Sequence, residues 1–114
     1  GHKAATELLA LPNPPTAIFC ENDEMAIGAI QGIKQAGRSV PGDISVAGFD
    51  DISFAAFADP PLTTIAQPAE EFGSTAVSLL IDLIEGRLGK APKVILPFDL
   101  IQRASTGPAP AGLS

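Results

Sequence analysis

The sequence predicts an α/β fold in which a mainly parallel sheet is flanked by helices. The first observation is that short apolar runs alternate along the chain with longer segments whose apolar residues recur at helical spacing. The second is that Gly, Pro, Asn and Asp residues stand at nearly every junction between these segments. Strands that alternate with helices form βαβ units, in which the strands are parallel and the crossovers right-handed.

The N-terminal part predicts a helix, a strand and a second helix. Apolar residues at helical spacing predict a first helix that ends at the proline-rich break of residues 12–15. Residues 16–20 form an apolar run typical of a strand buried on both faces of a parallel sheet. Asn22 or Asp23 then offers an N-cap for a second helix, which is expected to stop at Gly37.

The same order of elements follows in the middle of the chain. Residues 40–43 turn the chain, and residues 44–49 predict a second buried strand, which ends on the pair Asp50 and Asp51. A short apolar segment, residues 52–58, leads into a third predicted strand at residues 62–65.

The last part of the chain predicts a long helix and a final strand. Pro68 suits a first helical position, apolar residues at helical spacing continue to Ile84, and Gly86 or Gly89 is expected to end the helix. Apolar residues between 94 and 101 predict a strand that Pro97 places at an edge or a bulge. Beyond Arg103 the Ser, Thr, Gly, Pro and Ala composition favours a tail that is disordered at its end.

Composition excludes several functions for these residues. The formal net charge of −6 repels phosphate backbones, so any DNA contact is expected outside this segment. A single cysteine, Cys20, excludes an internal disulfide and is expected to be a small buried hydrophobe. No apolar run reaches the roughly 18 residues that a membrane span needs. Because the only methionine is Met25, the chain is expected to be part of a longer protein.

The residues that catalysis or metal binding needs are scarce. The only histidine is the second residue, and the only cysteine lies inside a predicted strand. A hydrolytic triad, a metal centre and a bound cofactor are therefore not expected. The glycines Gly28, Gly32 and Gly37 fall in or after a helix, so they do not form a phosphate-binding loop.

Polar residues gather where the predicted strands end. Asn22 and Asp23 follow the first strand, Asp50 and Asp51 follow the second, and Gln67 lies just beyond the third. In open α/β sheets ligands bind at the carboxyl ends of the strands, and these side chains suit the hydroxyls of a sugar or another polyol. The alternative for each single residue is structural: Asn22 or Asp23 caps the second helix, and Asp51 caps the 52–58 segment.

Two phenylalanines, Phe54 and Phe57, lie three residues apart on the short apolar segment. They predict either an apolar contact patch at the surface or burial against their own subdomain.

Five phrases of the sequence stand out: PTAIFC at 15–20, NDEMAIG at 22–28, VPGDISVAGFDD at 40–51, PPLTTIAQP at 60–68 and RAST at 103–106. Together they resemble the C-terminal portion of LacI/GalR transcription regulators. The NDEMA phrase is shared with periplasmic sugar-binding proteins, whereas PPLTTIAQP after GFDD is far more specific to the regulators.

The resemblance implies a two-lobed, periplasmic-binding-protein-like fold with a small polar effector bound between the lobes. Residues 1–67 would belong to the C-terminal lobe, residues 68–102 to the other lobe, and residues 103–114 to the return and the tail. By position Asp50, Asn22 and Gln67 match effector-binding places in the family. The helix around Met25 and the segment with Phe54 and Phe57 resemble the surfaces on which family members form dimers.

The function implied is the sensing of an effector by a cytoplasmic regulator, which binds operator DNA through a helix-turn-helix domain that this chain lacks. The alternative is a periplasmic sugar-binding protein of an ABC transporter, which shares the fold. An enzyme is the third class, and no pair of nucleophile and base supports it.

Overall fold

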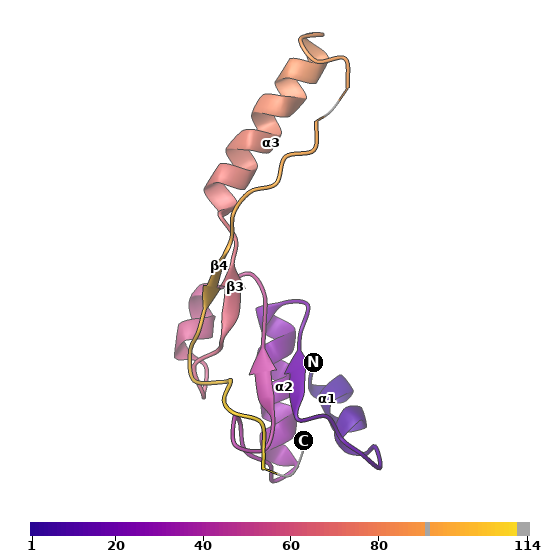
Figure 1. Ribbon diagram of the computed structural model, residues 1–114, viewed down its shortest axis with the longest axis vertical. Helices are drawn as coiled ribbons and strands as arrows, with labels where there is room; N and C mark the ends of the chain where they lie inside the picture. Colours follow the sequence, from indigo (N-terminus) through magenta and orange to yellow (C-terminus); the bar gives the residue numbers. More distant parts are fainter. Residues whose placement is uncertain (91, 112–114) are drawn as a thin grey trace. The chain divides into compact units, whose positions relative to one another are not determined.

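The computed structural model describes residues 1–90 and 92–111. Strands and helices alternate along it, as the sequence predicts, and the α/β fold class is confirmed (Figure 1). In chain order the elements are α1 (His2–Leu9), β1 (Ala17–Phe19), α2 (Asp23–Gln35), β2 (Ser45–Ala47), the 3-10 helix η1 (Ser53–Phe57), β3 (Thr64–Ala66), α3 (Ala69–Ile84) and β4 (Asp99–Ile101).

The chain divides into two compact units. The first comprises residues 1–66 together with 100–114, and the second comprises residues 67–99. The assignment of residues 1–67, 68–102 and 103–114 to lobes of an intact fold stays a prediction.

The strands of the first unit form a parallel arrangement. β1 and β2 pair in parallel, with Ile18 opposite Val46. Parallel bridges continue from this pair towards β3, joining Ala47 to Thr63 and Asp50 to Ala66. The carboxyl ends of the strands therefore lie at one edge of the unit, which is where the sequence places its polar residues.

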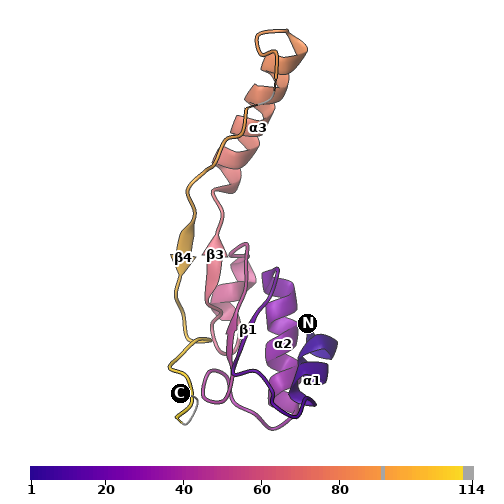
Figure 2. The same ribbon diagram turned by 45° about the vertical axis from the view of Figure 1, so that its right-hand side comes forward.

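The core of the first unit lies between α2 and the strands. It contains Ile33, Val46 and Leu62, each fully buried. α1 packs beside α2 in both views (Figures 1 and 2). Gly32 permits this packing, because a Cβ at that position would lie 2.9 Å from the carbonyl oxygen of His2.

The prediction that β1 is buried on both faces is wrong. Successive side chains of a strand point to opposite faces. The face of Ile18 and Cys20 packs on the core, whereas Ala17 is exposed and Phe19 keeps 66% of its surface exposed. β1 is therefore a half-buried strand.

The final strand is shorter than predicted. Only Asp99–Ile101 forms a strand, β4, which pairs with β3, whereas residues 92–98 have no regular structure. A strand exists only where a neighbour satisfies its backbone groups, and Pro97 has no N–H to offer one. Apolar composition alone therefore overestimates the length of this strand.

The second unit contains α3, whose bounds match the predicted helix. Pro68 is the N-cap and not the first helical residue, and Gly86, with a φ of 72°, follows the C-cap. No residue of α3 is buried, and its most exposed large apolar side chains are Phe72 and Ile84. Among the described residues, no helix has the length and apolar character needed to cross a membrane.

The segment after Arg103 belongs to the first unit. Ser105 is fully buried, and its hydroxyl donates to the carbonyl oxygen of Val46 at 2.6 Å and accepts from the backbone N–H of Thr63 at 2.8 Å. Ordered structure thus continues past the point where the composition becomes tail-like. The end of the predicted disordered tail, residues 112–114, lies outside the described residues.

Candidate ligand-binding site

Backbone hydrogen bonds join the segments at the carboxyl ends of β1, β2 and β3. The N–H of Asp23 donates to the carbonyl oxygen of Phe49 at 2.9 Å, and the N–H of Asp50 donates to that of Ile65, also at 2.9 Å. These bonds bring the segments that carry Asn22 and Asp50 together at one edge. The sequence predicts this neighbourhood from the order of strands and helices.

Asn22 has a structural role at this edge. Its side-chain oxygen accepts a hydrogen bond from the backbone N–H of Met25 at 2.9 Å, so it is the N-cap of α2. The capping interpretation is thus confirmed for Asn22. Its side-chain amide N–H groups are not used by this cap, and an amide can donate while its oxygen accepts. The proposed contact of Asn22 with a ligand is therefore compatible with its role as a cap.

Asp50 is exposed and has an unusual backbone conformation. Its φ is 109°, and that of Asp51 is 53°, whereas residues with a side chain rarely adopt positive φ. Such a conformation costs on the order of 1–3 kcal/mol and persists only where the surroundings over-determine it. Two consecutive residues of this kind at the end of a strand mark the turn as a candidate binding element.

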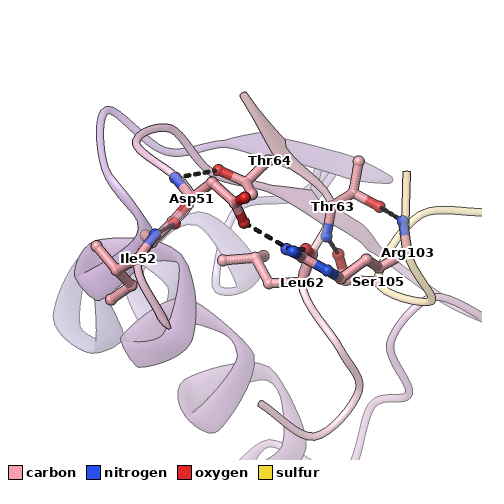
Figure 3. Close-up of polar contacts among 8 residues, drawn as sticks. Asp51, Ile52, Leu62, Thr63, Thr64, Arg103 and Ser105 are labelled. Carbon is pink, nitrogen blue, oxygen red and sulfur yellow. Dashed lines mark hydrogen bonds and ion pairs between the residues drawn. The ribbon is translucent and has the colours of Figure 1, made fainter. Parts of the chain in front are cut away.

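Asp51 does not cap the following helix, and the interpretation of Asp51 as a cap is wrong. The N-cap of η1 is Ile52, without a side-chain cap bond. The Asp51 carboxylate instead accepts from the guanidinium of Arg103 at 2.7 Å, and both side chains are mostly buried (Figure 3). A hydrogen bond from a charged guanidinium stabilises a part-buried carboxylate more than one from a backbone N–H at the start of a short 3-10 helix would.

Asp23 is the buried centre of the edge. Its side chain is fully buried and accepts from the Thr64 hydroxyl at 2.5 Å and from the backbone N–H of Ile52 at 2.9 Å. A Cβ on residue 48 would collide with the Asp23 carboxylate, so glycine is required there. Asp23 therefore ties together α2, the start of η1 and β3.

Gln67 lies in the second unit, at its first residue, and is exposed. Its participation in the same site as Asp50 stays a prediction.

Met25, Phe54 and Phe57 are all exposed, at 43%, 60% and 80%. Burial of the two phenylalanines against their own subdomain is therefore excluded. Phe54 and Phe57, but not Met25, line a groove of about 320 Å³ between α2 and η1, which is bordered by the ion pair of Lys34 with Asp59. The groove presents apolar surface with a charged rim.

Two ionisable groups of the first unit have shifted pKa values. Burial raises the pKa of the Cys20 thiol, which keeps it protonated and unreactive at neutral pH. Hydrogen bonds from the hydroxyl and the backbone N–H of Ser39 lower the pKa of Asp43. Neither group lies on the Asp50 turn, so they do not define the site.

The chemistry that this edge offers is hydrogen bonding. The carboxylate of Asp50 can accept hydrogen bonds from vicinal hydroxyls, and the side-chain N–H groups of Asn22 can donate to a hydroxyl oxygen. Within residues 1–90 and 92–111, no group of three or more His, Cys, Asp or Glu residues is arranged to hold a metal ion.

An α/β architecture with polar side chains at the carboxyl ends of parallel strands is typical of domains that bind small molecules. The chain belongs to the family of periplasmic binding protein-like domains, which it matches over residues 2–106, and its relatives there are LacI-type transcriptional regulators, as the resemblance implies.

Among the relatives is the HTH-type transcriptional repressor CytR of Escherichia coli K12. It is 47% identical over 110 residues, which cover 96% of this chain and 32% of CytR. The chain thus spans about a third of the length of this relative.

Among the solved structures similar to the chain are two regulators with bound ligands. The Lac repressor dimer bound to operator and the anti-inducer ONPF is 38% identical with a TM-score of 0.82, over 92% of this chain and 36% of the repressor. A LacI family transcriptional regulator of Enterococcus faecium with bound ribose is 38% identical with a TM-score of 0.77, over 96% of this chain and 39% of that regulator.

Proposed function

We propose that this chain is the effector-sensing part of a LacI-type transcriptional regulator. The observation that carries the proposal is the Asp50–Asp51 turn, where two consecutive positive-φ residues present an exposed carboxylate at the end of a parallel strand. Strain of this kind is retained where a side chain must be aimed at a ligand. The relatives are repressors, and one similar structure is described with bound ribose.

The effector in this proposal is a sugar or a similar small polar molecule, bound by Asp50 and Asn22, with Gln67 as a further proposed contact. A carboxylate that accepts from two neighbouring hydroxyls distinguishes a polyol from an apolar ligand of the same size. The residues of the site bind the effector and do not transform it.

The effector controls operator DNA through a domain outside this chain. A ligand shifts an equilibrium only through its different affinities for two conformations. A tenfold change in operator affinity needs about 1.4 kcal/mol of coupling free energy, which a few hydrogen bonds to hydroxyls can supply. The acidic surface of this segment, with its net charge of −6, leaves the phosphate contacts to the other domain. In this proposal the protein works in the cytoplasm, where its operator is.

The proposed assembly is a homodimer that uses Met25, Phe54 and Phe57. Exposed aromatic side chains around a groove with a charged rim have the composition of a protein interface. Two similar structures are described as Lac repressor dimers.

The experiment that tests the function is a thermal-shift screen of the full-length protein with pentoses, hexoses and disaccharides, with D-ribose and cellobiose among them. A binding sugar should raise Tm and change the affinity for operator DNA in the same concentration range. The relatives are transcriptional repressors, which favours a regulator over the periplasmic sugar-binding protein of an ABC transporter. A sugar that raises Tm and leaves the affinity for operator DNA unchanged would contradict the proposal. Turnover of the sugar would instead identify an enzyme.

A further inference from the structure

The contacts of Arg103 extend the site beyond the residues that face a ligand. Arg103 lies two residues after β4, where the chain has returned to the first unit. One guanidinium nitrogen donates to the carbonyl oxygen of Leu62 at 2.9 Å, and another donates to the Asp51 carboxylate at 2.7 Å. Its backbone N–H donates to the Thr63 hydroxyl at 3.0 Å (Figure 3).

These contacts suit an arginine in particular. A guanidinium presents its donors in a rigid planar fork, so two bonds in fixed directions hold the group in one orientation. The side chains of Arg103 and Asp51 are only 20% and 26% exposed, which limits screening by water and salt. The pair is thus a fixed contact and not a mobile surface ion pair.

The Asp50–Asp51 turn is held on both sides. Before it, the backbone N–H of Asp50 donates to the carbonyl oxygen of Ile65 at 2.9 Å. After it, the backbone N–H of Ile52 donates to the buried carboxylate of Asp23 at 2.9 Å. Within the turn, the backbone N–H of Asp51 donates to the Thr64 hydroxyl at 3.4 Å, and the Asp51 carboxylate accepts the shorter, charged bond from Arg103 at 2.7 Å. The charged bond opposes relaxation of the turn to negative φ.

We propose that Arg103 is a positioning residue that holds the Asp50–Asp51 turn in its positive-φ conformation and thereby orients the Asp50 carboxylate towards a polyol effector. The inference rests on the proposed function for the identity of the ligand. Arg103 acts through Asp51 and does not touch the effector. Because it follows the return strand β4, it also links the conformation of the binding turn to the segment that carries the chain back into this unit.

The test is hydrogen–deuterium exchange of the full-length protein, followed by mass spectrometry of peptides that span residues 49–53 and α2. Arg103→Met and Asp51→Asn should each accelerate exchange of the 49–53 amides about tenfold, because the charged bond that restrains the turn is lost. α2 should exchange as in the wild type. The double variant should behave like either single variant, and Arg103→Lys, which keeps the charge but not the fork, should lie between.

Lys34→Met is the matched control, because it removes a cation from the more exposed ion pair with Asp59. It should leave the exchange of residues 49–53 unchanged. Unchanged exchange of 49–53 in Arg103→Met, or equal acceleration in α2, overturns the inference. If Arg103→Met does not fold, Asp51→Asn and Arg103→Lys give the test in its place. Unchanged exchange of the 49–53 amides in both of these variants would overturn the inference.

A different variant, Asp50→Asn, tests the proposed function separately from the role of Arg103. Asp50→Asn should keep the slow exchange of the turn but lose the thermal shift with the sugar that stabilises the wild type. If that shift persists while Arg103→Met loosens the turn, the assignment of Asp50 to the ligand is wrong and the ordering role of Arg103 stands.

Discussion

Among single residues, the buried carboxylate of Asp23 joins α2 to β3 and to the start of η1. Asp23 accepts hydrogen bonds from Thr64 and from the backbone of Ile52, and all of its surface is buried. Its removal leaves two donors without a partner in the core, which costs the full desolvation of those groups.

Asp23→Ala should therefore lower the free energy of unfolding by about 2–4 kcal/mol. Urea denaturation followed by circular dichroism measures the change. Glu24→Ala, at the next and exposed position of the same helix, is the control and should change stability by less than about 1 kcal/mol. Equal effects of the two substitutions would show that the buried contacts of Asp23 are not structural.

The lowered pKa of Asp43 predicts that the stability of the fold depends on pH. Its pKa is lowered below the ordinary value of 3.8 by the hydrogen bonds from Ser39, so its folded state favours the charged form. The stabilisation is fully present above pH 3.8 and is lost as pH falls through the lowered pKa. An NMR titration should show the Asp43 carboxyl titrating below 3.8 in the wild type and closer to that value in Ser39→Ala. A midpoint that Ser39→Ala does not move would exclude Ser39 as the cause.

At the scale of elements, the close approach of α1 to α2 depends on a glycine. A Cβ at residue 32 would lie 2.9 Å from the backbone of His2, whereas one at residue 73, in α3, meets nothing within 4 Å. Both glycines lie inside helices, so the intrinsic helix propensity of alanine favours each substitution equally.

Gly32→Ala should destabilise the protein by about 1–3 kcal/mol, because backbone must move to admit the methyl group. Gly73→Ala should instead stabilise α3 by about 1 kcal/mol. Chemical denaturation of the two variants in parallel gives the comparison. A gain in stability from both would mean that α1 does not pack on α2 as described.

The sequence predicts the helices of this chain better than its strands and its contacts between distant residues. Periodicity and capping residues identify α2 and α3 nearly to the residue, because helix signals are local. Strand lengths depend on distant neighbours, so the apolar run around Val94 and Ile95 is misread as strand. The contact of Asp51 with Arg103 joins residues 52 apart in the chain, and no local pattern distinguishes it from a cap.

At the scale of the whole molecule, the proposed dimer follows from the exposed groove of α2 and η1. Phe57 keeps 80% of its surface exposed, more than any other large apolar side chain among the described residues of the first unit. A buried aromatic anchor typically contributes 2 kcal/mol or more to an interface, roughly a thirtyfold change in Kd.

Phe57→Glu should therefore weaken dimerisation of the full-length protein at least about thirtyfold, as measured by sedimentation equilibrium. Leu11→Ser, which also alters an exposed apolar residue but lies in the loop after α1, should leave the dimer intact. A dimer unaffected by Phe57→Glu would place the interface elsewhere.

In the proposed function, the exposed carboxylate of Asp50 senses an effector without contributing to DNA binding. Fluorescence anisotropy of labelled operator DNA tests this claim, with the full-length wild type and Asp50→Ala, each with and without the sugar that raises the Tm of the wild type. Asp50→Ala should bind operator with the affinity of the wild type and should lose the change in that affinity when the sugar is added. An unchanged response to the sugar in Asp50→Ala would contradict the claim.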